Sequence, residues 1–332
     1  MIIKLKMKNM QNLKIYQWPT LKLDFTKSRE DVLINPNWVT GFIDGEGSFI
    51  IAIIASTGAT KKKVSLRLSV TQKSHSVGVL YDLQKFFGCG SVIPSSKDCM
   101  RFVVQKKEDL FNKIIPHFIS YPLITSKGLN FDSFREASEI VKKGEHLNLE
   151  GLNKIINIKN KMNTNRSFDD LFNYLIKKEI KLNPHWIQAF VDAEGSFGTL
   201  ITKSSISKKV VTRNRLSISQ STHDYFVLKA IKDFFKSGYL DPKVENIDNL
   251  DKALQCKDSS FYYNSSPESI LPFFDEYPMY TRKLLDYLDF KKFFLLKKDK
   301  RYLTTEGFEE MASIAKNMNS GRSDISNYRR IK

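Results

Sequence analysis

The sequence predicts an α+β fold of two pseudo-symmetric units, each with the element order αββαββα. Two observations support this prediction. A nine-residue segment occurs twice, at 39–47 and 187–195, each time preceded by Asn-Pro-x-Trp and followed by Ser-Phe. A strand-like stretch at 68–72 recurs at 216–220, with the same offset of 148 residues. A gapless repeat over several separate positions indicates a duplicated unit rather than a chance match.

Each copy of the nine-residue segment predicts a short helix. Asn35 and Asn183 are favourable N-cap residues, and the proline that follows each of them suits the first helical position. Gly47 and Gly195 stand one residue after the last acidic residue of the two segments. We expect these glycines to end the helices in a left-handed conformation.

Small residues predict that the two helices pack against each other. Gly41 and Gly45 are four residues apart, as are Ala189 and Ala193, so one face of each helix lacks bulky side chains. This spacing allows two backbones to approach closely. Because no stretch is long and apolar enough for a membrane span, the partner of each helix is expected to be the other helix.

The packed helices would bring Glu46 and Glu194 to equivalent positions near a pseudo-twofold axis. Two adjacent carboxylates repel each other unless one is protonated or a cation lies between them. Carboxylate oxygens suit Mg²⁺, which binds few carboxylates and keeps water or phosphate in its other positions. The alternative is a pair of solvated glutamates on ordinary amphipathic helices, and the duplication disfavours it.

The remaining elements of the first unit follow from periodicity and turn residues. Residues 49–55 read as a buried strand, and 63–71 alternate between apolar and polar side chains, which is typical of a strand with one buried face. Further elements are a helix over 76–87, strands near 90–93 and 100–105, a helix over 108–118 and two helices within 130–163. The second unit repeats this order with eight extra residues, which we expect within 241–257.

The repeat also divides the chain. We expect a basic N-terminal extension over 1–30, a first unit over 31–166, a linker over 167–182, a second unit over 183–320 and a C-terminal tail over 321–332. The extension is rich in lysine and lacks the apolar core of a secretory signal. It therefore reads as a basic arm or as the remnant of an upstream reading frame.

The charge of the chain indicates a polyanionic partner. The 53 Lys and Arg residues against 36 Asp and Glu residues leave a net charge of +17, far more than solubility requires. Lys, Asn, Ile, Phe and Tyr are abundant, a bias that AT-rich codons produce. An organellar gene, in a mitochondrion or another organelle, is therefore expected.

The polar face of the predicted sheets is a candidate nucleic-acid surface. A solvated sheet face is the ordinary explanation of such a pattern, but the net charge and the carboxylate pair favour a phosphate-rich partner. Strand ribbons fit the major groove of DNA, where Arg and Gln read base edges. The sequence leaves open whether Ile50, Ala52 and Ile54 face the groove or the core. The candidate DNA-binding residues are Arg67, Ser69, Arg101, Gln105, Arg213, Arg215 and Ser217.

The duplicated segment resembles the LAGLIDADG motif of homing endonucleases, in their single-chain form with two repeats. The resemblance covers about residues 33–320, and each copy keeps the order of small, apolar and acidic positions, with Glu at the eighth. It implies antiparallel sheets that form a DNA-binding saddle, and a monomer. It further implies a site-specific endonuclease that makes a double-strand break in a long, non-palindromic DNA target by metal-dependent phosphodiester hydrolysis.

The resemblance also implies a metal site. In this family the acids at the eighth position coordinate divalent metal, and we expect two or three Mg²⁺ ions shared at the pseudo-twofold axis. Asp44 and Asp192 are expected to be structural and to hold the helix end or a neighbouring turn. The implied ligands are the carboxylates of Glu46 and Glu194 and the main-chain carbonyls of Gly45 and Ala193.

Four further residues match catalytic positions of the family. Gln72 and Gln220, at the ends of equivalent strands, resemble the residue that positions water near the metals. Lys127 and Lys283 each lie six residues after the tyrosine of a matched Tyr-Pro pair. They resemble the lysine that helps to activate water or to stabilise charge, although plain surface roles are the ordinary alternative for all four.

Two other functions stay open at this point. Related proteins serve as intron maturases that bind structured RNA as a splicing cofactor, with or without DNA cleavage. A DNA-binding protein of the same fold without catalysis is the third possibility. The intact pair of glutamates favours cleavage over both.

Overall fold

The computed structural model describes residues 24–29, 33–55, 62–207, 209–243 and 258–322, and it contains the two predicted units. Each unit has a four-stranded antiparallel sheet, with strand orders β1-β2-β4-β3 and β5-β6-β8-β7. The predicted α+β class is confirmed. None of the helices in the described ranges is long and apolar enough to cross a membrane.

The first unit follows the predicted order closely. One predicted helix, 108–118, is instead divided, because a π-helical turn at Leu110–Ile114 separates α3 from α4. Its elements are α1 Pro36–Glu46, β1 Gly47–Ala55, β2 Lys62–Lys73, α2 Gly78–Phe87, β3 Ser91–Ser96, β4 Cys99–Val104, α3 Lys107–Asp109, α4 Ile115–Ser120, α5 Lys127–Lys142 and α6 Leu149–Lys159.

The second unit repeats this order after a helix, α7 Phe168–Ile176, that lies in the expected linker. Most of 241–257, where we expect the eight extra residues, lies outside the described residues. The elements are α8 Pro184–Glu194, β5 Gly195–Lys203, β6 Val210–Ser221, α9 Tyr225–Phe235, β7 Tyr239–Asp241, β8 Ser259–Asn264, α11 Pro267–Glu276, α12 Lys283–Lys298 and α13 Thr305–Asn317.

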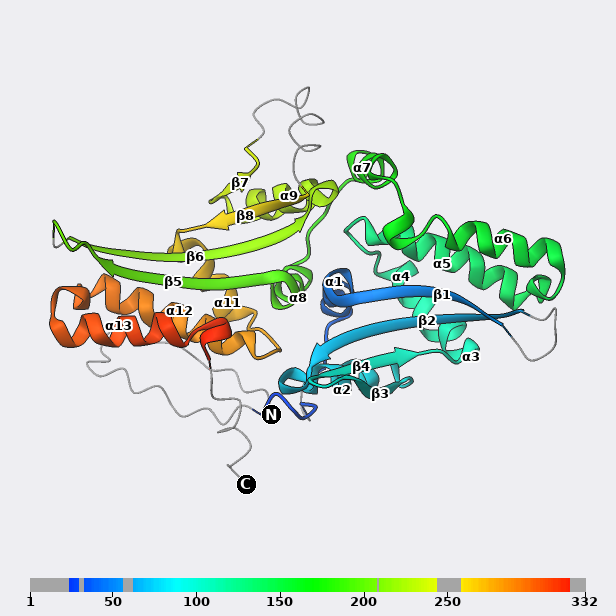
Figure 1. Ribbon diagram of the computed structural model, residues 1–332, viewed down its shortest axis with the longest axis horizontal. Helices are drawn as coiled ribbons and strands as arrows, with labels where there is room; N and C mark the ends of the chain where they lie inside the picture. Colours follow the sequence, from blue (N-terminus) through cyan, green and yellow to red (C-terminus); the bar gives the residue numbers. More distant parts are fainter. Residues whose placement is uncertain (1–23, 30–32, 56–61, 208, 244–257, 323–332) are drawn as a thin grey trace.

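The two units are related by a half-turn about an axis along the view of Figure 1. Helices α1 and α8 lie side by side at the centre, and the long strands β1 and β2 extend to one side while β5 and β6 extend to the other. The helical pairs α5–α6 and α12–α13 occupy equivalent outer positions. The ends of α1 and α8 are therefore the natural place for a site shared by both units.

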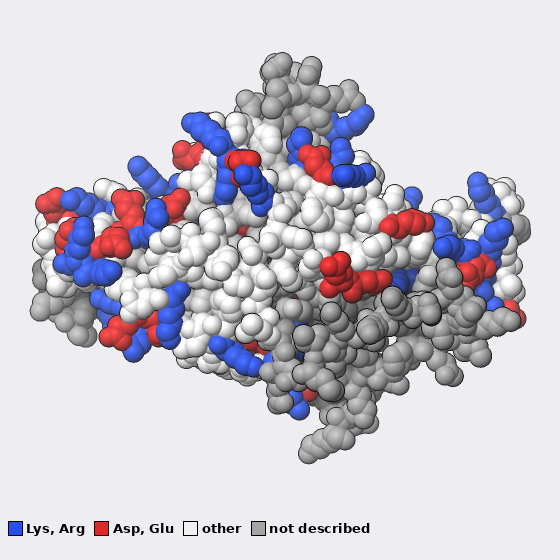
Figure 2. Space-filling model, turned by 180° about the vertical axis from the view of Figure 1, so that it is seen from behind, with Lys and Arg blue, Asp and Glu red and all other residues white. Residues whose placement is uncertain are grey.

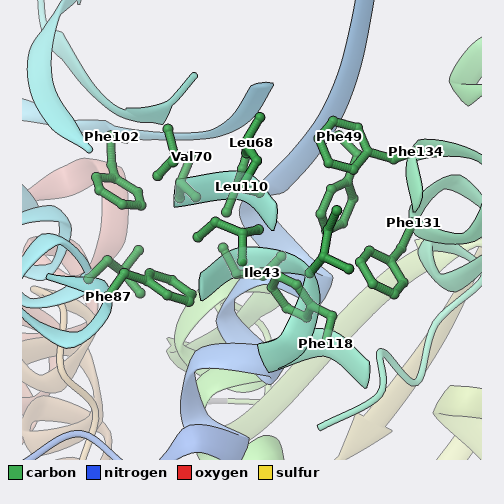
Figure 3. Close-up of a cluster of buried hydrophobic side chains, with 14 of the residues drawn as sticks. Ile43, Phe49, Leu68, Val70, Phe87, Phe102, Leu110, Phe118, Phe131 and Phe134 are labelled. Atoms are coloured by element: carbon green, nitrogen blue, oxygen red, sulfur yellow. The ribbon is translucent and has the colours of Figure 1, made fainter. Parts of the chain in front are cut away.

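Each unit has its own apolar core between the sheet and its helices. In the first unit, Phe49 of β1 and Phe102 of β4 are fully buried, and the aromatic rings of α4 and α5 pack near Phe49 (Figure 3). In the second unit, Phe197 and Tyr262 occupy the equivalent positions. Two separate cores leave the helix pair α1–α8 as the main apolar contact between the units.

The helix starts match the sequence prediction, but the helix ends differ from it. Asn35 and Asn183 accept hydrogen bonds from Asn37 N and His185 N, both at 2.9 Å. Gly47 is extended rather than left-handed, with φ −81°, because α1 runs directly into β1; Gly195 has φ −77°. Glycine is needed at 47 for space, since a Cβ there would stand 2.5 Å from Ile43 Cγ2.

Part of the expected N-terminal extension packs on the first unit. Gly78 N, at the start of α2, donates to Phe25 O at 2.8 Å. Arg29 forms an ion pair with the buried Asp82 of α2, with 2.8 Å between Nη2 and Oδ2. The same guanidinium lies 3.5 Å from the ring centre of Tyr280 in the second unit, so this segment contacts both units.

Candidate active site

The close approach of α1 and α8 is confirmed, and it sets the position of the two glutamates. A Cβ added to Gly41 would stand 2.4 Å from Trp186 O, and one added to Gly45 would stand 2.4 Å from Ala193 Cβ. The Gly45 Cβ would also be 3.5 Å from Glu194 Oε1, so that carboxylate lies against the backbone of the opposite helix. The predicted packing thus brings both helix ends to one place.

Burial and mutual repulsion disfavour charge on the glutamates. Burial raises the pKa of Glu46, hydrogen bonding from Gln72 lowers it, and the charge of Glu194 raises it further. Burial also raises the pKa of Glu194, although the positive charges of Lys127 and Lys283 counter this. Two half-buried carboxylates with raised pKa values form a site that a cation would stabilise.

The lysines hold the ends of the two central helices. Nζ of Lys127 donates to the carbonyl oxygens of Ile43 and Gly45, both at 2.9 Å. Nζ of Lys283 donates to the carbonyls of Val191 and Ala193, both at 3.1 Å. A cation at a helix C-terminus adds hydrogen bonds to the last carbonyls and interacts favourably with the helix dipole.

Each lysine also lies in the field of both glutamates. Burial lowers the pKa of Lys127, and the charges of Asp44 and then Glu194 counter this effect. Burial likewise lowers the pKa of Lys283, countered by Asp192 and then Glu46. The glutamate with the larger effect on each lysine belongs to the other unit. The groups at the axis therefore form one electrostatic cluster rather than two independent ones.

The structure gives Asp44 and Asp192 the structural role that we expected. Asp44 accepts hydrogen bonds from Ile124 N, Thr125 N and Thr125 Oγ1 at 2.8, 3.2 and 2.6 Å. Asp192 accepts from Tyr280 N and, at 3.0 Å, from Thr281 N. Both aspartates are buried. Each therefore anchors the loop that precedes one of the two lysines.

The glutamines lie where the long central strands end beside the glutamates. Gln72 is near the end of β2, opposite Met100, and hydrogen bonding from its side chain acts on Glu46. Gln220 near the end of β6 acts on Glu194 in the same way and also donates to Ser219 O at 2.8 Å. Two sets of glutamate, glutamine and lysine thus meet around the axis.

The candidate metal ligands at this site are all oxygen atoms. Within the described ranges, no group of three or more His, Cys, Asp or Glu side chains could hold a metal ion. The two carboxylates and the neighbouring carbonyls of Gly45 and Ala193 are hard ligands of the kind that Mg²⁺ or Ca²⁺ prefers. The donor set fits a metal that keeps several positions for water or phosphate.

The structure decides which face of β1 is open. Ile50 pairs with Arg67 and Ile54 with Lys63, so these side chains share one face of the sheet, while Phe49 and Ile51 are buried. Ile54 is 50% exposed. Ile50, Ala52 and Ile54 therefore stand on the open face beside the basic residues, not in the core.

The candidate DNA-binding residues of the first unit share this open face. Arg101 Nη2 donates to Ser95 Oγ at 2.6 Å, and Gln105 Nε2 donates to Ser65 Oγ at 3.0 Å. Among the described residues, the Nε atoms of Arg67 and Arg101 are buried and have no hydrogen-bond partner. Ser69 is 7% exposed, so its hydroxyl is less accessible than the sequence suggested.

The open face of the second unit is more aromatic than the sequence analysis recognised. Arg215 lies 4.5 Å from the ring centre of Tyr263, and Tyr263 pairs with Ser217 and with Tyr239. Arg213 is exposed on the same face of β6. The alternation of 259–264 carries this signal, because the core residue Tyr262 lies between the two outward-facing aromatic residues Phe261 and Tyr263.

Charged side chains are not spread evenly over one face of the molecule. Figure 2 shows one face on which Lys and Arg side chains are interspersed with Asp and Glu toward the ends and the upper edge. The centre of that face is largely uncharged. Mixed charge of this kind is ordinary for a solvated surface.

A duplicated α+β unit with paired acidic helix ends and two open sheets defines a class of nuclease. The family model described as LAGLIDADG endonuclease matches residues 39–138 and 187–294, together more than half of the chain. The chain belongs to this family.

Individual relatives agree with this assignment. The probable intron-encoded endonuclease 3 of Neurospora crassa is 31% identical over 320 residues, covering 89% of this chain and 57% of that protein. I-SmaMI bound to uncleaved DNA target in the presence of calcium ions has a TM-score of 0.74 and 28% identity, covering 86% of this chain and 99% of that one. I-SmaMI bound to cleaved DNA has a TM-score of 0.75 and 29% identity, and the match covers 87% of this chain and 98% of that one. The sheets thus have the saddle arrangement of solved DNA-bound structures.

Proposed function

We propose that this protein is a homing endonuclease that makes a site-specific double-strand break in a long, non-palindromic DNA target. The observation that carries the proposal is the meeting of Glu46 and Glu194 at the contact of α1 and α8, between two open sheets. Family membership and the likeness to DNA-bound I-SmaMI support it. The chain covers 57% of the Neurospora relative, so its activity has to be tested on this chain itself.

We propose DNA contacts along both open sheet faces. Arg67, Arg101, Arg213 and Arg215 would meet phosphates and base edges, since arginine is a common partner of both. The two faces differ in residues, aliphatic in β1 and aromatic in β8, which supports an asymmetric target. The polar residues Gln105 and Ser217 complete the proposed surface, to which Ser69, 7% exposed, contributes little.

The proposed cofactor is Mg²⁺, held by the carboxylates of Glu46 and Glu194 with the carbonyls of Gly45 and Ala193. When bound, the metal supplies a Lewis acid and an activated water for phosphodiester hydrolysis. A carbonyl oxygen carries two lone pairs, so Gly45 O accepts the Lys127 hydrogen bond and keeps one pair for a cation.

The other residues of the site orient the reactants. Gln72 and Gln220, whose side chains hydrogen-bond to the glutamates, would hold a water molecule by hydrogen bonds. Lys127 and Lys283 carry positive charge to the region where negative charge develops on a phosphate during attack. Two sets of these groups, one from each unit, match the two strands of a duplex.

We propose the two units as 31–166 and 183–320, joined by 167–182, acting together as a monomer. The relative from Neurospora is named as intron-encoded, which together with the abundance of Lys, Asn, Ile, Phe and Tyr supports expression in an organelle. Both solved structures compared above are described with DNA. The RNA-binding alternative has no comparable support.

The test is cleavage of a double-stranded DNA that carries the intron-free insertion site, with each strand labelled. We expect both strands to be cut with Mg²⁺ and neither with a chelator. Glu46→Gln or Glu194→Gln should abolish the cutting of both strands while DNA binding persists, because removal of a carboxylate near phosphates relieves repulsion. Binding without any cutting by the parent would reject the nuclease, and full activity of Glu46→Gln would reject the assigned site.

A further inference from the structure

The loop that carries Lys127 is anchored from the opposite unit. Nε1 of Trp186, on α8, donates to Oδ2 of Asp44, on α1, at 2.7 Å. Both side chains are buried, with exposures of 1% and 3%. The same Oδ2 accepts from Ile124 N at 2.8 Å. One carboxylate oxygen thus joins the second unit to the backbone of the loop three residues before Lys127.

Asp44 passes this restraint along the loop. Its other oxygen, Oδ1, accepts from Thr125 Oγ1 at 2.6 Å, and the same hydroxyl oxygen accepts from Lys127 N at 3.2 Å. Asp224, also in the second unit, accepts from Ser126 N at 2.7 Å. The chain of contacts from Trp186 to Lys127 therefore begins with two short, buried hydrogen bonds at Asp44 and ends with a longer, part-buried one at Lys127 N.

The equivalent loop of the second unit is held differently. Trp38 and Trp186 occupy the same position in the repeat. Yet Trp38 Nε1 is buried and has no hydrogen-bond partner among the described residues. Tyr280 replaces Ile124 there, and its ring packs 4.9 Å from the Trp38 ring and under the guanidinium of Arg29. A stack of side chains takes the place of the indole–carboxylate bond.

We propose that Trp186 is a positioning residue for the Lys127 site, and that cleavage of one DNA strand depends on it while cleavage of the other does not. The inference rests on the proposed nuclease function. The indole N–H fixes the orientation of the Asp44 carboxylate, which in turn fixes the loop that presents Lys127 to Gly45. Without that donor, Oδ2 keeps only Ile124 N, and the carboxylate is held by the loop itself and no longer by the second unit.

The experiment compares Trp186→Phe with Trp38→Phe on strand-labelled target DNA. Both variants remove an indole from equivalent buried positions, but only the first breaks a hydrogen bond. Lys127→Met identifies the strand that Lys127 serves. We expect Trp186→Phe to slow that strand by about tenfold or more, as expected for losing a hydrogen bond to a carboxylate, and to leave the other strand nearly unchanged. Trp38→Phe should show no strand bias.

A second pair of measurements separates positioning from folding. Replacing Trp186 by benzothienylalanine keeps the ring size but removes the N–H donor. It should reproduce the strand bias, while its melting temperature should fall less than that of Trp186→Phe, because the packing of the ring is kept. Hydrogen exchange in the DNA-free protein should be faster at the amides of 124–127 in Trp186→Phe, while those of 280–283 stay protected. Hydrogen exchange tests the anchoring of the loop without any DNA. If the parent protein cuts no DNA, the proposed function fails, but the anchoring can still be tested by exchange.

Three results would overturn the inference. The first is equal slowing of both strands by Trp186→Phe and by the benzothienyl variant. The second is the same strand bias in Trp38→Phe. The third is unchanged exchange at 124–127 after loss of the indole donor.

Discussion

At the residue scale, the site is a cluster of buried ionisable groups whose charged forms lower the free energy of unfolding. Burial raises the pKa of Glu46 and lowers that of Lys127, so neither charged form is favoured by its surroundings alone. Active sites characteristically contain such perturbed groups. The cluster is therefore expected to reduce the stability of the metal-free protein.

We predict that Glu46→Gln stabilises the metal-free protein at neutral pH. The pKa of Glu46 is raised above its ordinary value of 4.5, so the folded state binds this proton more tightly than the unfolded chain. The raised pKa therefore contributes to the free energy of unfolding. This contribution is fully present below pH 4.5 and is lost as pH rises through the folded-state pKa. Melting temperatures across this range should show a gain for Glu46→Gln that grows with pH. A constant gain at all pH values would contradict the assignment.

The lysines should divide their work between the two strands. Lys127 donates to Gly45 O at the end of α1, and Lys283 donates to Ala193 O at the end of α8. Lys127→Met and Lys283→Met should therefore each slow one strand far more than the other and leave nicked DNA, with opposite strands nicked. Denaturing gels with each strand labelled will show this. Equal slowing of both strands by each variant would refute one lysine per site.

The sequence alone was sufficient to predict that the glutamates lie at equivalent ends of two packed helices. It was not sufficient to predict how the loops before the two lysines are anchored. Glu46 and Glu194 follow from a repeat whose spacing places them at equivalent helix ends. Trp38 and Trp186 look interchangeable in the sequence, because both follow Asn-Pro-x. Their difference arises from Tyr280, which is distant along the chain and replaces a smaller residue, and local patterns do not report such neighbours.

At the element scale, the contact of α1 with α8 determines whether the site forms. Its small residues predicted the contact, and the missing Cβ of Gly41 leaves just enough space for the Trp186 backbone. The extended conformation of Gly47 was not predictable from the helix pattern, because it depends on the strand that follows without a loop. The division of 108–118 by a π-helical turn was likewise not visible in the periodicity.

We predict that Gly41→Leu disrupts folding and not only activity. A Cβ at this position would stand 2.4 Å from Trp186 O, and overpacking typically costs about 1–3 kcal/mol, more when a backbone atom is the obstacle. Gly198→Leu is the matched control, since a Cβ there meets only Arg215 O at 3.7 Å. Thermal melting should separate the two variants clearly. Parental melting and cutting by Gly41→Leu would show that the helices do not pack closely in solution.

At the scale of the whole molecule, we expect the net charge of +17 to be the main determinant of the proposed DNA affinity. Composition predicted a polyanionic partner, and alternation along the strands predicted which face would carry the arginines. The alternation of 259–264 indicates that Phe261 and Tyr263 share a face, but these residues were missed, because which face they occupy depends on the pairing of β8 with β6. Register between distant strands is a property of the folded chain, not of either segment.

We predict that DNA affinity falls steeply as salt concentration rises. Binding that neutralises phosphates releases counterions, so the logarithm of the affinity should fall linearly with the logarithm of the salt concentration. Arg67→Ala and Arg213→Ala should each flatten this slope by roughly one unit if they contact phosphates. Titrations from low to moderate salt provide the measurement. A nearly flat dependence for the parent would exclude nucleic acid as the main partner.

The backbone contact between Gly41 and Trp186 has a consequence for the DNA product. Since Glu46 and Glu194, the proposed metal ligands, end α1 and α8, we expect the separation of the two cuts along the duplex to depend on the distance between these helices. We expect the open sheet faces to select the target sequence without setting that distance. Variants with altered open faces should recognise new targets and still leave single-stranded ends of the parental length.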